Sequence, residues 1–279
     1  MTYRSLLVLL DQDPLCAART EVAIRLARNL DCHLVGVAPT GLVEMPTMPE
    51  AAASFAQLAT LAWDTLREQA QQASRRFRDE CGKASLKSFE VVVDEADKAA
   101  SLVRHAHCTD LTVLTQADPD APGHRMAQAV VEQVVLHSAR PTLILPYAGR
   151  VGDVGTHAMV AWDDSREAAR ALSDALPLLR RAARVQVVGW NEAGDDDSTL
   201  RPRLDDVRRW LMWQGVSAEV SVETTGIGIA EAMLSRAADL SVDLIVMGAY
   251  GHTRWSERML GGATRGLLKS MTVPVLMSH

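Results

Sequence analysis

Short apolar runs alternate along the chain with stretches whose apolar residues recur at helical spacing. In the first half, the apolar runs predict strands at 6–10, 34–38, 89–93, 111–114 and 142–145. The helical spacing predicts helices at 19–30, 50–82, 98–107 and 125–138. Alternation of this kind predicts a parallel sheet with helices on both faces.

The second half repeats the pattern. Its apolar runs predict strands at 158–162, 185–190, 218–222, 244–247 and 273–277, with helices at 166–181, 200–214, 229–240 and 265–268. Since five strands occur in the same order in each half, the sequence indicates an internal duplication. We therefore expect an α/β protein with two tandem open-sheet domains, each a five-stranded parallel sheet flanked by helices. The expected limits are 1–147 for the first domain, 148–155 for a linker and 156–279 for the second.

The two halves align without a gap over their last strands. Asp110 and Asp243 are offset by 133 residues, and the same offset relates Pro141 to Pro274. This alignment places Thr115, Asp118, Gln128 and Ala129 opposite Gly248, Gly251, Gly261 and Gly262. The first half therefore lacks every loop glycine, and Asp118 and Asp120 add negative charge there. We expect an anion to bind only in the second half.

The glycines of the second half follow a predicted strand and precede a predicted helix. Their spacing is Gly248-x2-Gly251-x9-Gly261. A strand, a glycine loop and a helix start bring backbone N–H groups up to an anion such as phosphate. Glycine suits such a loop because a side chain would block the approach or forbid the backbone angles.

This spacing resembles the nucleotide-loop signature of the universal stress protein family, and 271–277 is similar to the last strand of that family. The resemblance implies a Rossmann-like, adenine nucleotide alpha hydrolase-like fold. It also implies an ATP-binding regulatory protein of the stress response, with or without Mg²⁺, whose nucleotide lies in the C-terminal domain. The chain departs from the ATP binders of the family by having Gly262, and not Ser or Thr, after the third glycine. Thr264 matches a position where the family often has a hydroxyl.

The candidate cofactor-binding residues lie at three places in the second half. They are Asp163, Trp190, Met247, Gly248, Gly251, His252, Gly261, Gly262, Ala263 and Thr264. We expect the amides around Gly261 and Gly262 to hold phosphate and the Thr264 hydroxyl to donate a hydrogen bond. His252 either lends charge to the loop or is simply solvated.

Two of these residues have an equally plain structural interpretation. The resemblance implies that Asp163 contacts the adenosine part of ATP, but this residue can also cap the next helix with Asp164 and Ser165. Trp190 either packs on the adenine or belongs to the core. Asp11, the matching residue of the first half, is expected to cap its own helix.

Composition restricts the partners. The 29 basic and 35 acidic residues give a net charge of −6, and aromatic residues make up only 4%. These values argue against nucleic acid or an anionic membrane as the main partner. The N-terminal residues lack the pattern of a signal peptide, and we expect the four scattered cysteines to be buried thiols in a reducing compartment. We expect a cytoplasmic protein.

No catalytic or metal-binding motif is present. The chain has no lysine-bearing phosphate loop and no nucleophile elbow, and His105, His107 and Cys108 are better explained as a helix end than as metal ligands. We expect a binding protein and no enzyme, but the sequence leaves open a slow ATP hydrolase and a ligand-free interaction module. It also leaves open AMP or another adenylate as ligand, the protein partner, and a homodimer. The last strands of the two halves are expected to pair with each other within the chain.

Overall fold

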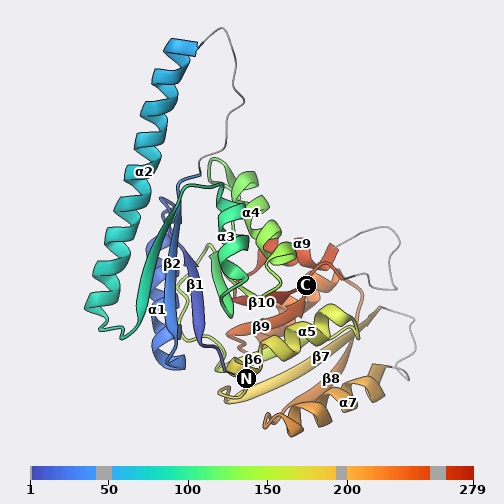
Figure 1. Ribbon diagram of the computed structural model, residues 1–279. Helices are drawn as coiled ribbons and strands as arrows, with labels where there is room; N and C mark the ends of the chain where they lie inside the picture. The colour runs from blue at the N-terminus through green and yellow to red at the C-terminus, as the bar shows by residue number, and fades with distance from the viewer. Residues whose placement is uncertain (1, 42–51, 193–199, 252–261) are drawn as a thin grey trace. The chain divides into compact units, whose positions relative to one another are not determined.

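The computed structural model describes residues 2–41, 52–192, 200–251 and 262–279 (Figure 1). By their contacts, these residues form two units: one runs from Arg4 to Val113, and the other combines residues 2–3 with Leu114 to His279. The contacts group the end of the first sequence half with the second half. The domain limits expected from the duplication, 1–147 and 156–279, describe the sequence repeat and stay a prediction.

The first unit is a parallel sheet with helices packed on it (Figure 1). In chain order its elements are β1 (Ser5–Leu9), α1 (Cys16–Leu30), β2 (His33–Pro39), α2 (Ala52–Lys83), β3 (Phe89–Asp94), α3 (Lys98–Ala106) and β4 (Leu111–Thr115). The strands lie in the order β3-β2-β1-β4 and all pair in parallel. This is the parallel α/β arrangement predicted from the alternating pattern.

The second unit contains the remaining elements. They are α4 (His124–His137), β5 (Thr142–Leu145), β6 (His157–Ala161), α5 (Arg166–Asp174), α6 (Leu176–Leu179), β7 (Arg184–Glu192), α7 (Leu200–Trp213), β8 (Glu219–Thr225), α8 (Ile229–Asp239), β9 (Leu244–Gly248), α9 (Gly262–Ser270) and β10 (Val275–Ser278). The strand order is β5-β10-β9-β6-β7-β8. The five strands of the second half are parallel to one another, as predicted.

The last strands of the two halves pair with each other, which confirms the prediction. β5 and β10 are antiparallel, with Val275 opposite Ile144 and Met277 opposite Thr142. Both strands are buried along their whole length. Each therefore covers the edge that the other would expose, and open edges of this kind promote unwanted strand pairing.

The duplication is visible in equivalent hydrogen bonds. Asp110 accepts bonds from the backbone N–H groups of Arg4 and Ser5 before β1. Its counterpart Asp243 accepts bonds from the N–H groups of Gly155, Thr156 and His157 before β6. In each half, one aspartate therefore anchors the start of the first strand.

The predicted helix at 166–181 is wrong in one respect. It consists of α5 and the short α6, with Ala175 between them and Pro177 in the first turn of α6. Proline lacks the N–H that would continue the hydrogen-bond ladder of α5, so a new helix begins there. All four cysteines are free, and Cys108 is exposed, contrary to the expectation of buried thiols. In the described residues, no helix is both long enough and apolar enough to cross a membrane.

Candidate functional site

The candidate site lies where β6 and β9 end. These strands are neighbours, with Val160 opposite Val246, so the residues that follow them meet at one edge of the sheet. Asp163 follows β6, Gly248 is the last residue of β9, and Ala249 to Gly251 come directly after it. The carboxyl edge of a parallel sheet is where open α/β folds place their ligands.

Gly248 is required by packing. A Cβ built on this residue would stand 2.5 Å from the amide nitrogen of Ala168 and 2.6 Å from the carbonyl carbon of Glu167. Both are backbone atoms of the first turn of α5, which cannot easily move aside. The backbone at the end of β9 therefore lies against the backbone of the first turn of α5.

Asp163 supports the cap of α5 but is not the cap itself. Ser165 is the N-cap residue, and its Oγ accepts a hydrogen bond from the N–H of Ala168 at 3.1 Å. The Ser165 hydroxyl donates to Oδ1 of Asp163 at 2.6 Å, and the Ser165 N–H donates to the same oxygen at 3.1 Å. A side chain does cap α5 at this place, as the capping interpretation expected, but the cap is Ser165 and not Asp163. Asp163 is exposed, so its carboxylate also faces solvent at the sheet edge.

The start of α9 is tied to the loop after β9. The N–H of Tyr250 donates to Oγ1 of Thr264 at 3.1 Å, and Thr264 is 3% exposed. Tyr250 has a φ of 54°, a left-handed conformation that few non-glycine residues adopt. The Thr264 oxygen is thus used as an acceptor within the protein.

The other predicted residues are placed as follows. Gly262 is exposed and begins α9, and Ala263 is half-buried beside it. Met247 is a buried core residue that pairs with Met277, so its side chain belongs to the core and not to the site edge. His252 and Gly261 lie outside the described residues.

Glu167 is a site residue that is not among those predicted from the sequence. It is 4% exposed, and its Oε2 lies 3.0 Å from the point where a Cβ on Gly251 would stand. Burial favours the neutral carboxyl, but hydrogen bonds from Arg166 and the backbone, together with the charges of Arg166 and His279, hold the pKa of Glu167 below its usual value. Glu167 is therefore a buried carboxylate at neutral pH, beside the second loop glycine.

The sequence contained a signal for this position. The buried residues of α5 are Glu167, Ala168, Ala171 and Leu172. This spacing puts the glutamate on the same helix face as the alanines and the leucine, which point to the sheet. A carboxylate on such a face is rarely buried without a purpose or a partner.

Trp190 is half-buried on β7, opposite Glu223 of β8, so it is not the core residue of one interpretation. Two other tryptophans, Trp162 and Trp210, line a hollow of about 390 Å³ between α5 and α7. Its remaining lining residues are Asp164, Ala169, Leu172, Arg203, Asp206 and Val207. Asp164, the residue after Asp163, is therefore part of the lining of the hollow, which has the size of a small-molecule site.

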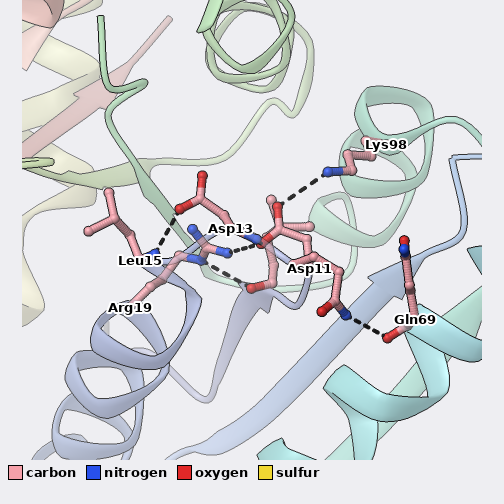
Figure 2. A network of polar contacts seen from close by, with 8 residues as sticks. Asp11, Asp13, Leu15, Arg19, Gln69 and Lys98 are labelled. Atoms are coloured by element: carbon pink, nitrogen blue, oxygen red, sulfur yellow. Dashed lines mark hydrogen bonds and ion pairs between the residues drawn. The ribbon is translucent and has the colours of Figure 1, made fainter. Parts of the chain in front are cut away.

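Asp11, the residue of the first half that is equivalent to Asp163, forms an ion pair with Arg19 (Figure 2). Nη2 of Arg19 lies 2.8 Å from Oδ1 of Asp11, and Nζ of Lys98 lies 3.4 Å from Oδ2. Arg19 is 2% exposed and also donates through Nε to the carbonyl of Leu9. Although burial opposes ionisation, Arg19 and Lys98 lower the pKa of Asp11.

This finding corrects the expectation that Asp11 caps the first helix. The N-cap residue of α1 is Leu15, and no side chain caps the helix. In the loop after β4, Asp118 accepts a hydrogen bond from the N–H of Asp120. One carboxylate, that of Asp118, therefore occupies the loop position that aligns with Gly251.

Metal ligands do not gather in the described part of the chain. No group of three or more His, Cys, Asp or Glu residues there could hold an ion. Nε2 of His105 lies 3.2 Å from Oδ2 of Asp94, which also accepts from the Ser101 hydroxyl. His105 thus contacts a carboxylate on the neighbouring strand β3.

The fold and the edge residues define an α/β protein with a carboxyl-edge glycine loop. Residues 156–279 match the model of the Universal stress protein family. No curated protein is similar enough in sequence to match.

Solved structures extend the likeness over the whole chain. A universal stress protein from Archaeoglobus fulgidus superposes with a TM-score of 0.74 at 16% identity, over 99% of this chain and 96% of that chain. A putative universal stress protein from Pseudomonas aeruginosa gives 0.60 at 17% identity, over 99% and 93%. At identities of 16% and 17%, the similarity shows a shared fold and nothing further. Another similar structure is that of the universal stress protein from Archaeoglobus fulgidus in complex with dAMP. The match spans 44% of the present chain and 96% of the Archaeoglobus fulgidus chain, at 20% identity and a TM-score of 0.37.

Proposed function

We propose that the second half of the chain binds one adenine nucleotide, with ATP and Mg²⁺ as the first candidate, and that the first half binds none. The nucleotide acts as a regulatory signal of the stress response that a protein partner senses. The role assigned to the site is binding and not turnover.

One observation carries the proposal: the hydrogen bond from the Tyr250 N–H to Oγ1 of Thr264. This bond holds the loop after β9 against the first turn of α9 at the carboxyl edge of the sheet. A loop and a helix start held together in this way present backbone N–H groups and the positive end of a helix to one anion.

The asymmetry between the halves rests on Asp11. A nucleotide that used this carboxylate would have to break its ion pair with Arg19, which is buried. Breaking a buried ion pair by taking away one partner costs about 3–5 kcal/mol. In the second half, the corresponding Asp163 is exposed and has only Ser165 as its partner among the described residues.

The second candidate function is a ligand-free interaction module. The buried carboxylate of Glu167 favours it, because negative charge beside Gly251 opposes phosphate. On that hypothesis, the glycines serve only the contact between β9 and α5.

Thermal unfolding with added nucleotide separates the two candidates. ATP–Mg at a hundred times its dissociation constant should stabilise the chain by about 2.7 kcal/mol, with GTP–Mg as the specificity control. Gly251→Val should abolish the shift because the added side chain meets Glu167. Gly226→Val is the matched control, since a Cβ there meets nothing within 4 Å. No shift of the unchanged protein at millimolar ATP–Mg would overturn the proposal.

A further inference from the structure

The hollow between α5 and α7 contains none of the loop glycines and has no part in the proposed nucleotide site. Its apolar lining consists of the indoles of Trp162 and Trp210 and the side chains of Ala169, Leu172 and Val207. Leu172 and Val207 are buried, whereas Ala169 is exposed. The hollow therefore reaches from the packed side of the two helices out to the surface.

The carboxylates of the lining are paired with arginines. Nε of Arg203 lies 3.6 Å from Oδ2 of Asp164, and Nη2 of Arg209 lies 2.9 Å from Oδ1 of Asp206. A charged ligand would have to compete with these ion pairs. An uncharged ring leaves them intact and gains free energy by taking apolar surface out of water.

One residue of the lining carries an unsatisfied donor. Trp162 is 8% exposed, and its Nε1 is buried without a hydrogen-bond partner in the described part of the chain. A buried N–H without a partner costs free energy. A bound molecule whose hydroxyl or carbonyl oxygen reached this indole would remove that cost, which a plain hydrocarbon would not.

The volume of the hollow sets the size of its ligand. The hollow measures about 390 Å³. A dry cavity of roughly 150 Å³ binds one benzene, so the hollow has room for about two fused rings. Planar rings also gain from packing on indoles beyond the apolar area that they bury.

We propose that the hollow is a second binding site, which takes an uncharged aromatic molecule of about two rings that carries a hydrogen-bond acceptor. Trp162 and Trp210 provide its aromatic walls, and the paired charges at Asp164 and Asp206 select against ions. This inference does not depend on nucleotide binding, because the ligand contacts α5 and α7 and not the loop after β9.

Equilibrium dialysis of the full chain against naphthalene derivatives tests the inference. The probes are naphthalene methanol, naphthoate and the naphthylmethylammonium ion, which share a ring system and differ in charge. The uncharged alcohol should bind roughly threefold or more tightly than either ion, because a charged group loses hydration at the apolar lining. Equal or tighter binding of either ion would overturn the inference, as would absence of binding of the alcohol at millimolar concentration.

Competition separates the hollow from the nucleotide site. ATP–Mg at millimolar concentration should leave the binding of the alcohol unchanged. Displacement of the alcohol by ATP–Mg would show that the two ligands share one site, and the inference of a second site would be wrong.

Ala169→Phe puts a ring into the hollow and should weaken binding of the alcohol roughly tenfold or more, since the added ring takes up the space of the ligand. Ala238→Phe is the matched control: Ala238 is exposed near the end of α8 and does not line the hollow. This control should keep the affinity of the unchanged protein. Equal affinities of the two variants would show that the alcohol binds elsewhere. The comparison of charges needs only the unchanged protein, so it tests the inference even if Ala169→Phe fails to fold.

Discussion

The backbone of Gly248 lies so close to Ala168 that a Cβ on the glycine would stand 2.5 Å from the alanine amide nitrogen. The contact joins the end of β9 to the first turn of α5. The first glycine of the loop therefore has a structural role that does not depend on a ligand. In the glycine signature, Gly248 thus serves the packing of β9 on α5, and Gly251 is the glycine at which we expect the ligand to approach the loop.

Gly248→Ala should destabilise the protein by about 1–3 kcal/mol, the usual cost of forcing atoms into a packed site. The backbone of Ala168 or Gly248 must shift to admit the methyl group. Urea unfolding followed by circular dichroism measures the change. Gly226→Ala, at an open position, should alter the free energy of unfolding by less than about 0.5 kcal/mol. Equal stability of both variants would disprove the close contact.

Asp11→Ala should destabilise the first unit by about 3 kcal/mol, because it removes the carboxylate that pairs with the buried guanidinium of Arg19. Asp13→Ala is the control: Asp13 is exposed, and its side chain accepts a hydrogen bond from the N–H of Leu15. Its effect should stay below about 1 kcal/mol. A similar loss in both variants would mean that the ion pair adds little stability.

The lowered pKa of Asp11 also makes the stability of the protein depend on pH. The pKa of Asp11 is lower in the folded chain than its ordinary value of 3.8, so the unfolded chain binds the proton more tightly. Its contribution is therefore complete above about pH 4 and is lost as the pH falls through the folded value. Urea unfolding between pH 5 and pH 2, values chosen to span roughly this range, should show a steeper loss for the unchanged protein than for Asp11→Ala. Parallel curves would contradict the predicted shift.

The antiparallel register of β5 and β10 can be tested by cross-linking. Thr142 and Met277 are opposite each other, and opposite residues of antiparallel strands lie at distances that a disulfide can span. Thr142→Cys with Met277→Cys should therefore form a disulfide on oxidative refolding, detected by mass spectrometry of the digested protein. Thr142→Cys with Leu276→Cys should not, because adjacent residues of a strand point to opposite faces. The reverse result would show a register shifted by one residue.

Elements that depend on local pattern were predictable from the sequence. Apolar runs located the strands because each lies buried in a parallel sheet. The pairing of 142–145 with the last strand followed from the need to cover two apolar edges. The break at Ala175 was also visible in principle, since Pro177 stands two residues later.

Features that depend on the approach of distant segments were not predictable. Glu167 is a site residue only because β9 and α5 meet at Gly248, and no spacing along α5 reveals that contact. Arg19 reaches Asp11 only once α1 has packed, so the aspartate looked like a helix cap. Trp162 and Trp210 line one hollow because α5 and α7 are neighbours in space and not in sequence.

The stoichiometry of ATP–Mg binding, measured by calorimetry on the full chain, tests the central claim most directly. We expect one site per chain, lost in Gly251→Val and unchanged in Asp118→Ala, which alters the aligned position of the first half. Two sites per chain would contradict the asymmetry and show that the first half binds despite the Asp11–Arg19 ion pair. No binding at millimolar ATP–Mg would contradict the claim that the second half is a nucleotide site.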